Sequence, residues 1–184
     1  MSKLFFTGDT HFNHHNIIKY ARRPFQNVKE MDEFIIQAWN SLVGDDDIVY
    51  HVGDFSNRDQ VYAKEVLQRL KGKIFLCIGN HDKHMRNLRR YLEGMAESFV
   101  VNIGNRQSIF LSHYLHKIWP RSHYGAWHLF GHSHGGMNSY AQNEGKILDV
   151  GVDSHGFKPW SLDEVVEVME KRPLNFNDLR RRHS

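Results

Sequence analysis

The stretch IFLCIGNHD, residues 74–82, joins an apolar strand directly to a cluster of polar side chains. Four other apolar runs end in the same way: LFFTGDTH at residues 4–11, IVYHVGD at 48–54, IFLSH at 109–113 and LFGHSH at 129–134. Nearly continuous apolar strands are typical of sheets that are covered on both faces. We therefore expect a buried sheet system whose strand ends bring Asp, Asn and His side chains together.

Short apolar runs predict strands at residues 4–6, 48–52, 74–78, 100–103, 109–111, 129–130 and 147–150. Apolar stripes at helical spacing cover residues 31–42, 63–70 and 162–169, with Asn27, Asn57 and Ser161 as the expected caps. We also expect a helix over 84–94 and an irregular loop over 114–127. Alternating strands and helices in the first half indicate an α/β fold. The closely spaced strands of the second half indicate that part of the sheet system is antiparallel.

The composition is that of an ordinary globular protein. Its 184 residues suit one domain over 1–184, with 40% hydrophobic and 24% charged residues and a net charge of +3. The weak positive charge favours an anionic substrate without specifying nucleic acid. The single cysteine, Cys77, excludes an intramolecular disulfide and is expected to be buried. We find no signal peptide and no membrane-spanning run, so a cytoplasmic setting is expected. The tail 175–184, with Arg180 to Arg182, is expected to be solvated or frayed, and a tail that binds RNA or phosphate is the alternative.

The polar clusters have the spacing of metal ligands. Asp9 with His11, and His132 with His134, are two residues apart, and such residues project to one side of an extended chain. Asp54 follows a glycine, and its two carboxylate oxygens make it the natural bridge between two cations. The candidate metal ligands are Asp9, His11, Asp54, Asn80, His113, His132 and His134.

The charge of this ligand set suits phosphate chemistry. Two divalent cations carry +4, which two aspartates and a bridging hydroxide reduce to +1, so the centre still attracts an anionic phosphoester. Two cations on the order of 3.5–4 Å apart can activate the hydroxide and stabilise the charge of an in-line displacement. Four imidazoles among the ligands point to Mn, Fe, Zn, Ni or Co rather than Ca or Mg, and manganese is our default.

His81 and Asp82 are the candidate catalytic residues. A protonated His81 could stabilise the phosphoryl oxygens or protonate the departing alkoxide, and Asp82 is expected to orient its ring. Asn13 and His14 follow the first cluster and are candidates for substrate contact. His51 lies in an apolar strand and is expected to be a packed core residue. Arg22 and Arg23 could bind phosphate, but we interpret them as solvent-facing, as exposed basic residues usually are.

The series Asp9-x-His11, Gly53-Asp54, residues 79–82, His113 and residues 131–134 resembles the calcineurin-like metallophosphoesterases, in particular a small single-domain bacterial and phage branch. The resemblance covers residues 4–153. It implies a four-layer α-β-β-α sandwich of two mixed sheets flanked by helices. It also implies that Asp9, His11 and His134 hold one metal ion, that Asn80, His113 and His132 hold the other, that Asp54 bridges the two ions, and that His81 is the catalytic histidine.

The expected function is a dinuclear metal-dependent phosphoesterase in which the bridging hydroxide attacks phosphorus directly. We favour a diester over a monoester, because the chain has little length for a cap over a small monoester. One alternative is a nuclease, which the basic residues Lys83, Arg86, Arg89 and Arg90 keep open. Another is a binding scaffold of the same fold that has lost catalysis, although no ligand position is damaged here.

Overall fold

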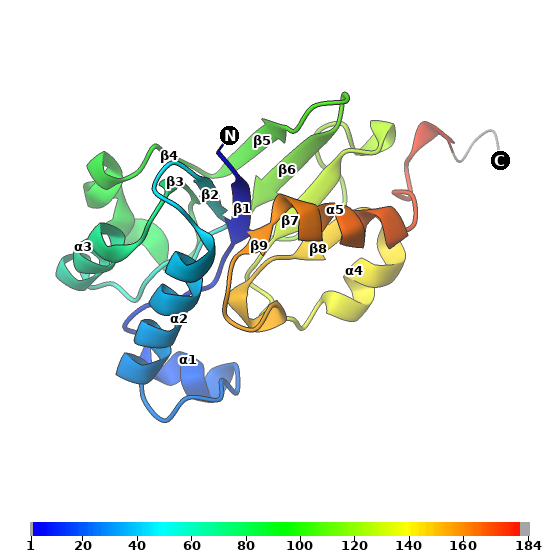
Figure 1. Cartoon of the computed structure of the whole chain (residues 1–184). Helices are drawn as coiled ribbons and strands as arrows, with labels where there is room; N and C mark the ends of the chain where they lie inside the picture. The colour runs from blue at the N-terminus through cyan, green and yellow to red at the C-terminus, as the bar shows by residue number, and fades with distance from the viewer. Residues whose placement is uncertain (1, 181–184) are drawn as a thin grey trace.

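Two β-sheets packed face to face form the centre of the protein, and the computed structural model describes residues 2–180 (Figure 1). The first sheet has the order β4-β3-β2-β1-β9. Its strands are β1 (Leu4–Thr7), β2 (Ile48–His51), β3 (Lys73–Cys77), β4 (Gly94–Ala96) and β9 (Trp160–Ser161). The second has the order β5-β6-β7-β8, from β5 (Ser98–Asn102), β6 (Ser108–Ser112), β7 (Trp127–Phe130) and β8 (Ile147–Asp149). Both sheets are mixed, because β9 runs antiparallel to β1 and β5 antiparallel to β6.

Successive side chains along a strand point to opposite faces of the sheet, so apolar residues build a core on each face. In β1, Phe5 packs in the cluster under the helices, whereas Phe6 packs in the cluster between the two sheets. In β6, Ile109 and Leu111 face the same inter-sheet cluster, and Phe110 faces a third cluster on the far side. The expected four-layer α-β-β-α sandwich is therefore confirmed.

Helices cover the outer faces of both sheets (Figure 1). The first sheet carries α1 (His15–Tyr20), α2 (Val28–Leu42), α3 (Gln60–Arg69) and the 3₁₀ helix η1 (Asp82–Tyr91). The second carries α4 (Asn138–Glu144) together with part of the 114–127 loop, and α5 (Leu162–Lys171) packs at the side of the inter-sheet core. Within residues 2–180, no helix is both long and apolar enough to cross a membrane.

Local sequence signals explain where the longer helices begin. The Asn27 side chain accepts a hydrogen bond from the Glu30 amide, and Ser161 forms a full capping box with Glu164, as expected. The cap of α3 is Asp59 instead of the predicted Asn57, because Asp59 accepts from two amides of the first turn.

Several expectations needed correction. The short elements β4, β9, α1 and α4 were not foreseen, because segments of two to seven residues contain too few positions to show a periodicity. Residues 82–91 wind as a 3₁₀ helix where an α-helix over 84–94 was expected. The tail is not frayed as far as Arg180, since Asn175 and Asp178 are buried and Asn175 donates to the carbonyls of Ser122 and Ala126. Residues 181–184, and so Arg181 and Arg182 of the basic tail, lie outside the described residues.

Candidate active site

The polar clusters lie just beyond the carboxyl ends of strands β1, β2, β3, β6 and β7. Because these strands run parallel to their neighbours within each sheet, their carboxyl ends meet along one edge of the sandwich. Left-handed backbone marks this edge: positive φ occurs at the ligand candidates Asp9, His11, Asp54, His132 and His134. Such angles are uncommon outside glycine and concentrate at functional sites, although Asp and His tolerate them better than most residues.

Glycine is required where the loops cross closely. Gly53 has φ +105°, and a Cβ there would lie 2.7 Å from Nδ1 of His113. A Cβ on Gly79 would collide with the backbone and the carboxylate of Asp54. These two glycines therefore allow three loops to converge on one small volume.

A first group of donor atoms comes from Asp9, His11 and His134, whose ligand atoms lie within 4.8 Å of one another. Asp9 uses Oδ2 to accept a hydrogen bond of 2.8 Å from the amide of His132. Its Oδ1, and Nε2 of His11, are buried and have no hydrogen-bond partner within residues 2–180. Buried polar atoms without partners are costly, so this pair is suited to a cation that would satisfy both.

A second group consists of Asp54, Asn80, His113 and His132. Around Nε2 of His113 lie Oδ1 of Asn80 at 3.0 Å, Nδ1 of His132 at 3.2 Å and Oδ2 of Asp54 at 3.5 Å. Donor atoms that share one first-row cation, each about 2.1 Å from it, are separated from one another by roughly 3.0–3.4 Å. The distances to Asn80 and His132 lie within this range and the distance to Asp54 is 0.1 Å above it, so the group fits a shared divalent cation.

Asp54 lies between the two groups. Its Oδ2 is 3.5 Å from Nε2 of His11 in the first group and 3.5 Å from Nε2 of His113 in the second. Its other oxygen, Oδ1, accepts a hydrogen bond of 2.9 Å from the amide of His81. One carboxylate oxygen thus faces both groups, which is the position that a bridging ligand requires.

Three of the histidines are held so that Nε2 faces the site. Nδ1 of His113 lies 3.0 Å from the carbonyl oxygen of Val52, and Nδ1 of His134 lies 2.7 Å from Oδ2 of Asp153. Nδ1 of His11 lies 3.2 Å from Nδ1 of His14. The carbonyl on His113 and the carboxylate on His134 can only accept a hydrogen bond, so each fixes a proton on Nδ1 and leaves Nε2 as the ligand atom.

Burial sets the charge of the site. It lowers the pKa of His11 well below its usual value, with the charge of Arg23 adding to the effect, so the ring is neutral as ligation requires. Burial also raises the pKa of Asp9, and the neighbouring Asp149 raises it further. A nearby cation would reverse the Asp9 shift, so the donor set fits divalent transition metal ions.

The structure corrects the expected role of Asp82. Both of its oxygens accept backbone hydrogen bonds, from the amides of Asp54 at 2.6 Å, Phe55 at 2.9 Å and Gly79 at 2.9 Å. In the described part of the chain, no hydrogen bond joins it to the His81 ring. Asp82 therefore joins the loops after β2 and β3 instead of orienting His81. Its motif was found correctly, but its partners are backbone groups that the sequence does not identify.

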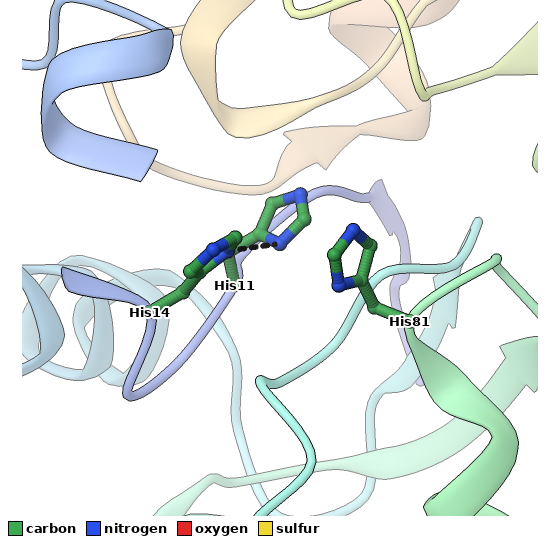
Figure 2. A group of neighbouring side chains, drawn as sticks. All are labelled: His11, His14 and His81. Atoms are coloured by element: carbon green, nitrogen blue, oxygen red, sulfur yellow. Dashed lines mark hydrogen bonds between the residues drawn. The ribbon is translucent and has the colours of Figure 1, made fainter. Parts of the chain in front are cut away.

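A cavity of about 640 Å³ opens over the site. Ligand candidates from both groups line it, together with His14, His81 and, around helix α1, residues 16, 17 and 20–22. Figure 2 shows the rings of His11, His14 and His81 gathered together, with centroids 5.0–5.4 Å apart. His14 thus lies where a substrate contact was expected.

Asn13 does not meet that expectation. Its amide donates to Asp32, its side chain lies 3.4 Å from Asp59, and it is not among the residues that line the cavity. Of the 114–127 loop, only Tyr114 reaches the site, where its hydroxyl lies 3.4 Å from Oδ1 of Asn80. His51 is a packed core residue, as predicted, and bonds to Thr10 and the Gly53 amide.

The sequence did not reveal the contacts that hold the first donor group in place. Arg23, interpreted as solvent-facing, is buried and forms a bidentate ion pair with Asp153, at 2.8 Å for both bonds. It also donates to the carbonyl oxygens of Asp9 and Thr10. Asp153 is the last residue of the segment that resembles the family, residues 4–153, and that resemblance was the available signal. An arginine 130 residues away in sequence gave none.

Known proteins resemble this chain over almost its whole length. An uncharacterized protein of Methanocaldococcus jannaschii is 37% identical, covering 97% of this chain and 99% of its own. The gene 66 protein of Mycobacterium phage L5 is 26% identical, covering 92% of this chain and 95% of its own. A crystal structure of a protein of unknown function from Aquifex aeolicus shares the fold, with a TM-score of 0.73 at 23% identity, covering 91% of this chain and 100% of that one.

The family to which the chain belongs is shown by comparison with models of protein families. The model of the calcineurin-like phosphoesterases matches residues 2–173, which include every ligand candidate and His81. The match therefore includes the whole of the site built above. The chain belongs to the calcineurin-like phosphoesterase family and is a metal-dependent hydrolase of phosphoesters.

Proposed function

We propose that this protein is a dinuclear metal-dependent phosphodiesterase. The observation that carries the dinuclear part is the position of Asp54, whose Oδ2 is 3.5 Å from His11 in one donor group and 3.5 Å from His113 in the other. The first cation is assigned to Asp9, His11 and His134, and the second to Asn80, His113 and His132, with Asp54 common to both. Two such cations, with manganese our default, would lower the pKa of a water nucleophile and offset negative charge on the phosphoryl group.

The protein's own groups supply the remaining steps. His81 lines the cavity. Its backbone amide donates a hydrogen bond to Oδ1 of Asp54, which holds the His81 backbone in place. We assign it the proton that passes to the departing oxygen, help that typically contributes about 10²–10⁴-fold. His14, 5.4 Å from His81 between ring centroids, is assigned a contact to the phosphoryl oxygens.

The shape of the surroundings favours a diester. His81 and Asn80 line two cavities: the larger one under α1, and a smaller one bordered by Arg58, Lys83 and His84. A diester has an organic group on each side of its phosphorus, and a monoester has one. Two cavities that meet at the same pair of residues therefore suit the diester.

The experiment is a substrate panel after loading with Mn, Ni, Zn or Fe. Phosphodiesters, including alkyl and nitrophenyl esters, are compared with the matched monoesters by kcat/KM. We expect at least one metal to give higher kcat/KM for the diester of each pair. Higher values for monoesters with every metal would contradict the diester assignment, and inactivity towards the whole panel would contradict the assignment of catalysis.

A further inference from the structure

We propose that the smaller cavity beside His81 is a second anion subsite, which binds a phosphate carried by the leaving group of the substrate. The cavity has a volume of about 300 Å³ and is lined by Arg58, Asn80, His81, Lys83 and His84. That volume is at the lower end of the range for small-molecule sites, about 300–1,000 Å³. The inference rests on the phosphodiesterase function proposed above and names the class of ester.

The charge of this cavity is positive. Arg58 and Lys83 are exposed, and within residues 2–180 neither forms an ion pair or a side-chain hydrogen bond. No acidic side chain lines the cavity. Further along η1, Arg86 pairs with Glu97 at 3.8 Å and Arg90 lies over the Tyr91 ring. Two free cations around an unoccupied volume are suited to bind a phosphate.

His84 forms a neutral wall of the same cavity. Its Nε2 lies 2.8 Å from the Ser56 hydroxyl, and its Nδ1 lies 3.0 Å from the carbonyl oxygen of His81. Burial lowers its pKa. His84 therefore holds the His81 backbone in place and leaves the positive charge of the cavity to Arg58 and Lys83.

The backbone at Arg58 is held in an uncommon conformation. Its φ is +50°, and the amide of Asp59 donates to the carbonyl of Asn57 at 2.6 Å, which closes a tight three-residue turn around it. The Asn57 amide donates to the Phe12 carbonyl, so the turn is fixed to the loop that carries His11. A non-glycine residue with positive φ costs free energy, and such strain concentrates at functional sites.

Asp59 does not neutralise Arg58 through a direct contact. Its Oδ1 accepts from the amides of Val61 and Tyr62, and its Oδ2 lies 3.4 Å from the side chain of Asn13. The carboxylate therefore caps α3, while the guanidinium of the preceding residue remains free to meet a ligand.

The position of His81 assigns this subsite to the leaving group. A residue that protonates the departing oxygen must lie beside the leaving group. His81 separates the basic cavity from the one under α1. The cavity under α1 contains one arginine, Arg22, together with the carboxylate of Asp54, whereas the basic cavity has two cations and no acidic side chain. The arm of the ester that carries a further anion belongs on the basic side. The substrate class is therefore a phosphodiester whose leaving group bears its own phosphate, as in a nucleotide chain.

The test uses three thymidine dinucleotides that differ in one group: no terminal phosphate, a 5′-terminal phosphate, or a 3′-terminal phosphate. With metal-loaded protein, we expect the phosphate on the departing nucleoside to raise kcat/KM about tenfold, equivalent to about 1.4 kcal/mol. Product analysis identifies which nucleoside departs. Arg58→Asn and Lys83→Gln should each remove most of this gain, and Arg58→Lys should keep much of it.

Arg106→Asn is the matched control. Arg106 is also an exposed arginine with positive φ, at +61°, but lies in the turn between β5 and β6, away from both cavities. Asparagine tolerates this conformation, so neither Asn variant adds backbone strain. The gain from the terminal phosphate should be unchanged in this variant.

The outcomes separate the two proposals. Equal rates for all three dinucleotides, or an equal loss on all three in Arg58→Asn, would overturn the second subsite and leave the phosphodiesterase function intact. If the protein hydrolysed monoesters but none of the three dinucleotides, both the second subsite and the phosphodiesterase function would be overturned. Abasic versions of the dinucleotides complete the test: a gain that persists without bases supports a site for phosphate, and a gain that requires the bases overturns that assignment.

Discussion

Replacing Asp153 with asparagine removes a charge from the support of the first donor group. Burial alone would raise the pKa of Asp153, but hydrogen bonds from His134 and Arg23 together outweigh it and lower the pKa, so the group is ionised. Asparagine has nearly the same shape but leaves the Arg23 guanidinium, which is fully buried, without a counter-charge. It also weakens the hold on Nδ1 of His134. We therefore expect losses in both stability and metal affinity.

The two losses have different sizes. Breaking a buried ion pair typically costs about 3–5 kcal/mol in the free energy of unfolding. Removing the group that orients a ligating histidine typically lowers metal affinity about 10–100-fold. Urea unfolding of the metal-free protein measures the first quantity. Competition between the folded protein and a chelating indicator for Mn²⁺ measures the second.

Glu33→Gln is the control for this prediction. Glu33 also forms a bidentate pair with an arginine, Arg69, at 2.6 and 2.7 Å, but both side chains are more than one-third exposed and far from the site. Breaking such a surface pair should cost about 1 kcal/mol or less and leave Mn²⁺ affinity unchanged. Wild-type Mn²⁺ affinity in folded Asp153→Asn would show that Asp153 does not hold His134 in position for metal binding.

Three further predictions concern other parts of the protein. His81→Ala should slow hydrolysis of alkyl diesters about 10²–10⁴-fold and nitrophenyl diesters far less, because a nitrophenolate leaves without a proton; equal losses would favour electrostatic stabilisation by His81. Asp82→Ala leaves three backbone amides without an acceptor, so the free energy of unfolding should fall by about 3 kcal/mol or more. If this variant had wild-type stability and the same rate losses as His81→Ala, Asp82 would instead act by orienting His81. Burial lowers the pKa of His128 to about 3, so the folded state keeps this ring neutral while the unfolded chain protonates it below about 6.5. Stability should therefore fall with decreasing pH, and His128→Gln should reduce the slope between pH 6 and 4 by about 1.4 kcal/mol per pH unit, measured by urea unfolding; identical slopes would show that His128 is not the group responsible.

The long apolar segments made much of this fold predictable. The strands at residues 4–6, 48–52 and 74–78 were visible because central parallel strands are apolar on both faces, which leaves an unbroken hydrophobic run. Helix α5 was visible because Ser161 and Glu164 carry a capping box. Strand β9 has only two residues, and its pairing with β1 depends on a partner more than 150 residues away.

The site was predictable to the extent that ligands come in short motifs. The candidate ligands lie together in two groups because each follows a strand end, which a sequence pattern can show. The roles of Asp82 and Arg23 were not readable, because their partners are backbone groups or a distant carboxylate. Asn13 shows the opposite case, since its closeness to His11 in sequence did not bring its side chain into the cavity.

Anomalous diffraction from crystals of the Mn²⁺-loaded protein would locate the metal ions between the two donor groups. We predict two peaks on the order of 3.5–4 Å apart. One should lie beside Asp9, His11 and His134, the other beside Asn80, His113 and His132, and Asp54 should contact both. His11, His14 and His81 also place three ring nitrogens within 4.8 Å of one another. A single peak at saturating Mn²⁺, or a peak among those three histidines in place of either predicted position, would contradict a dinuclear centre bridged by Asp54.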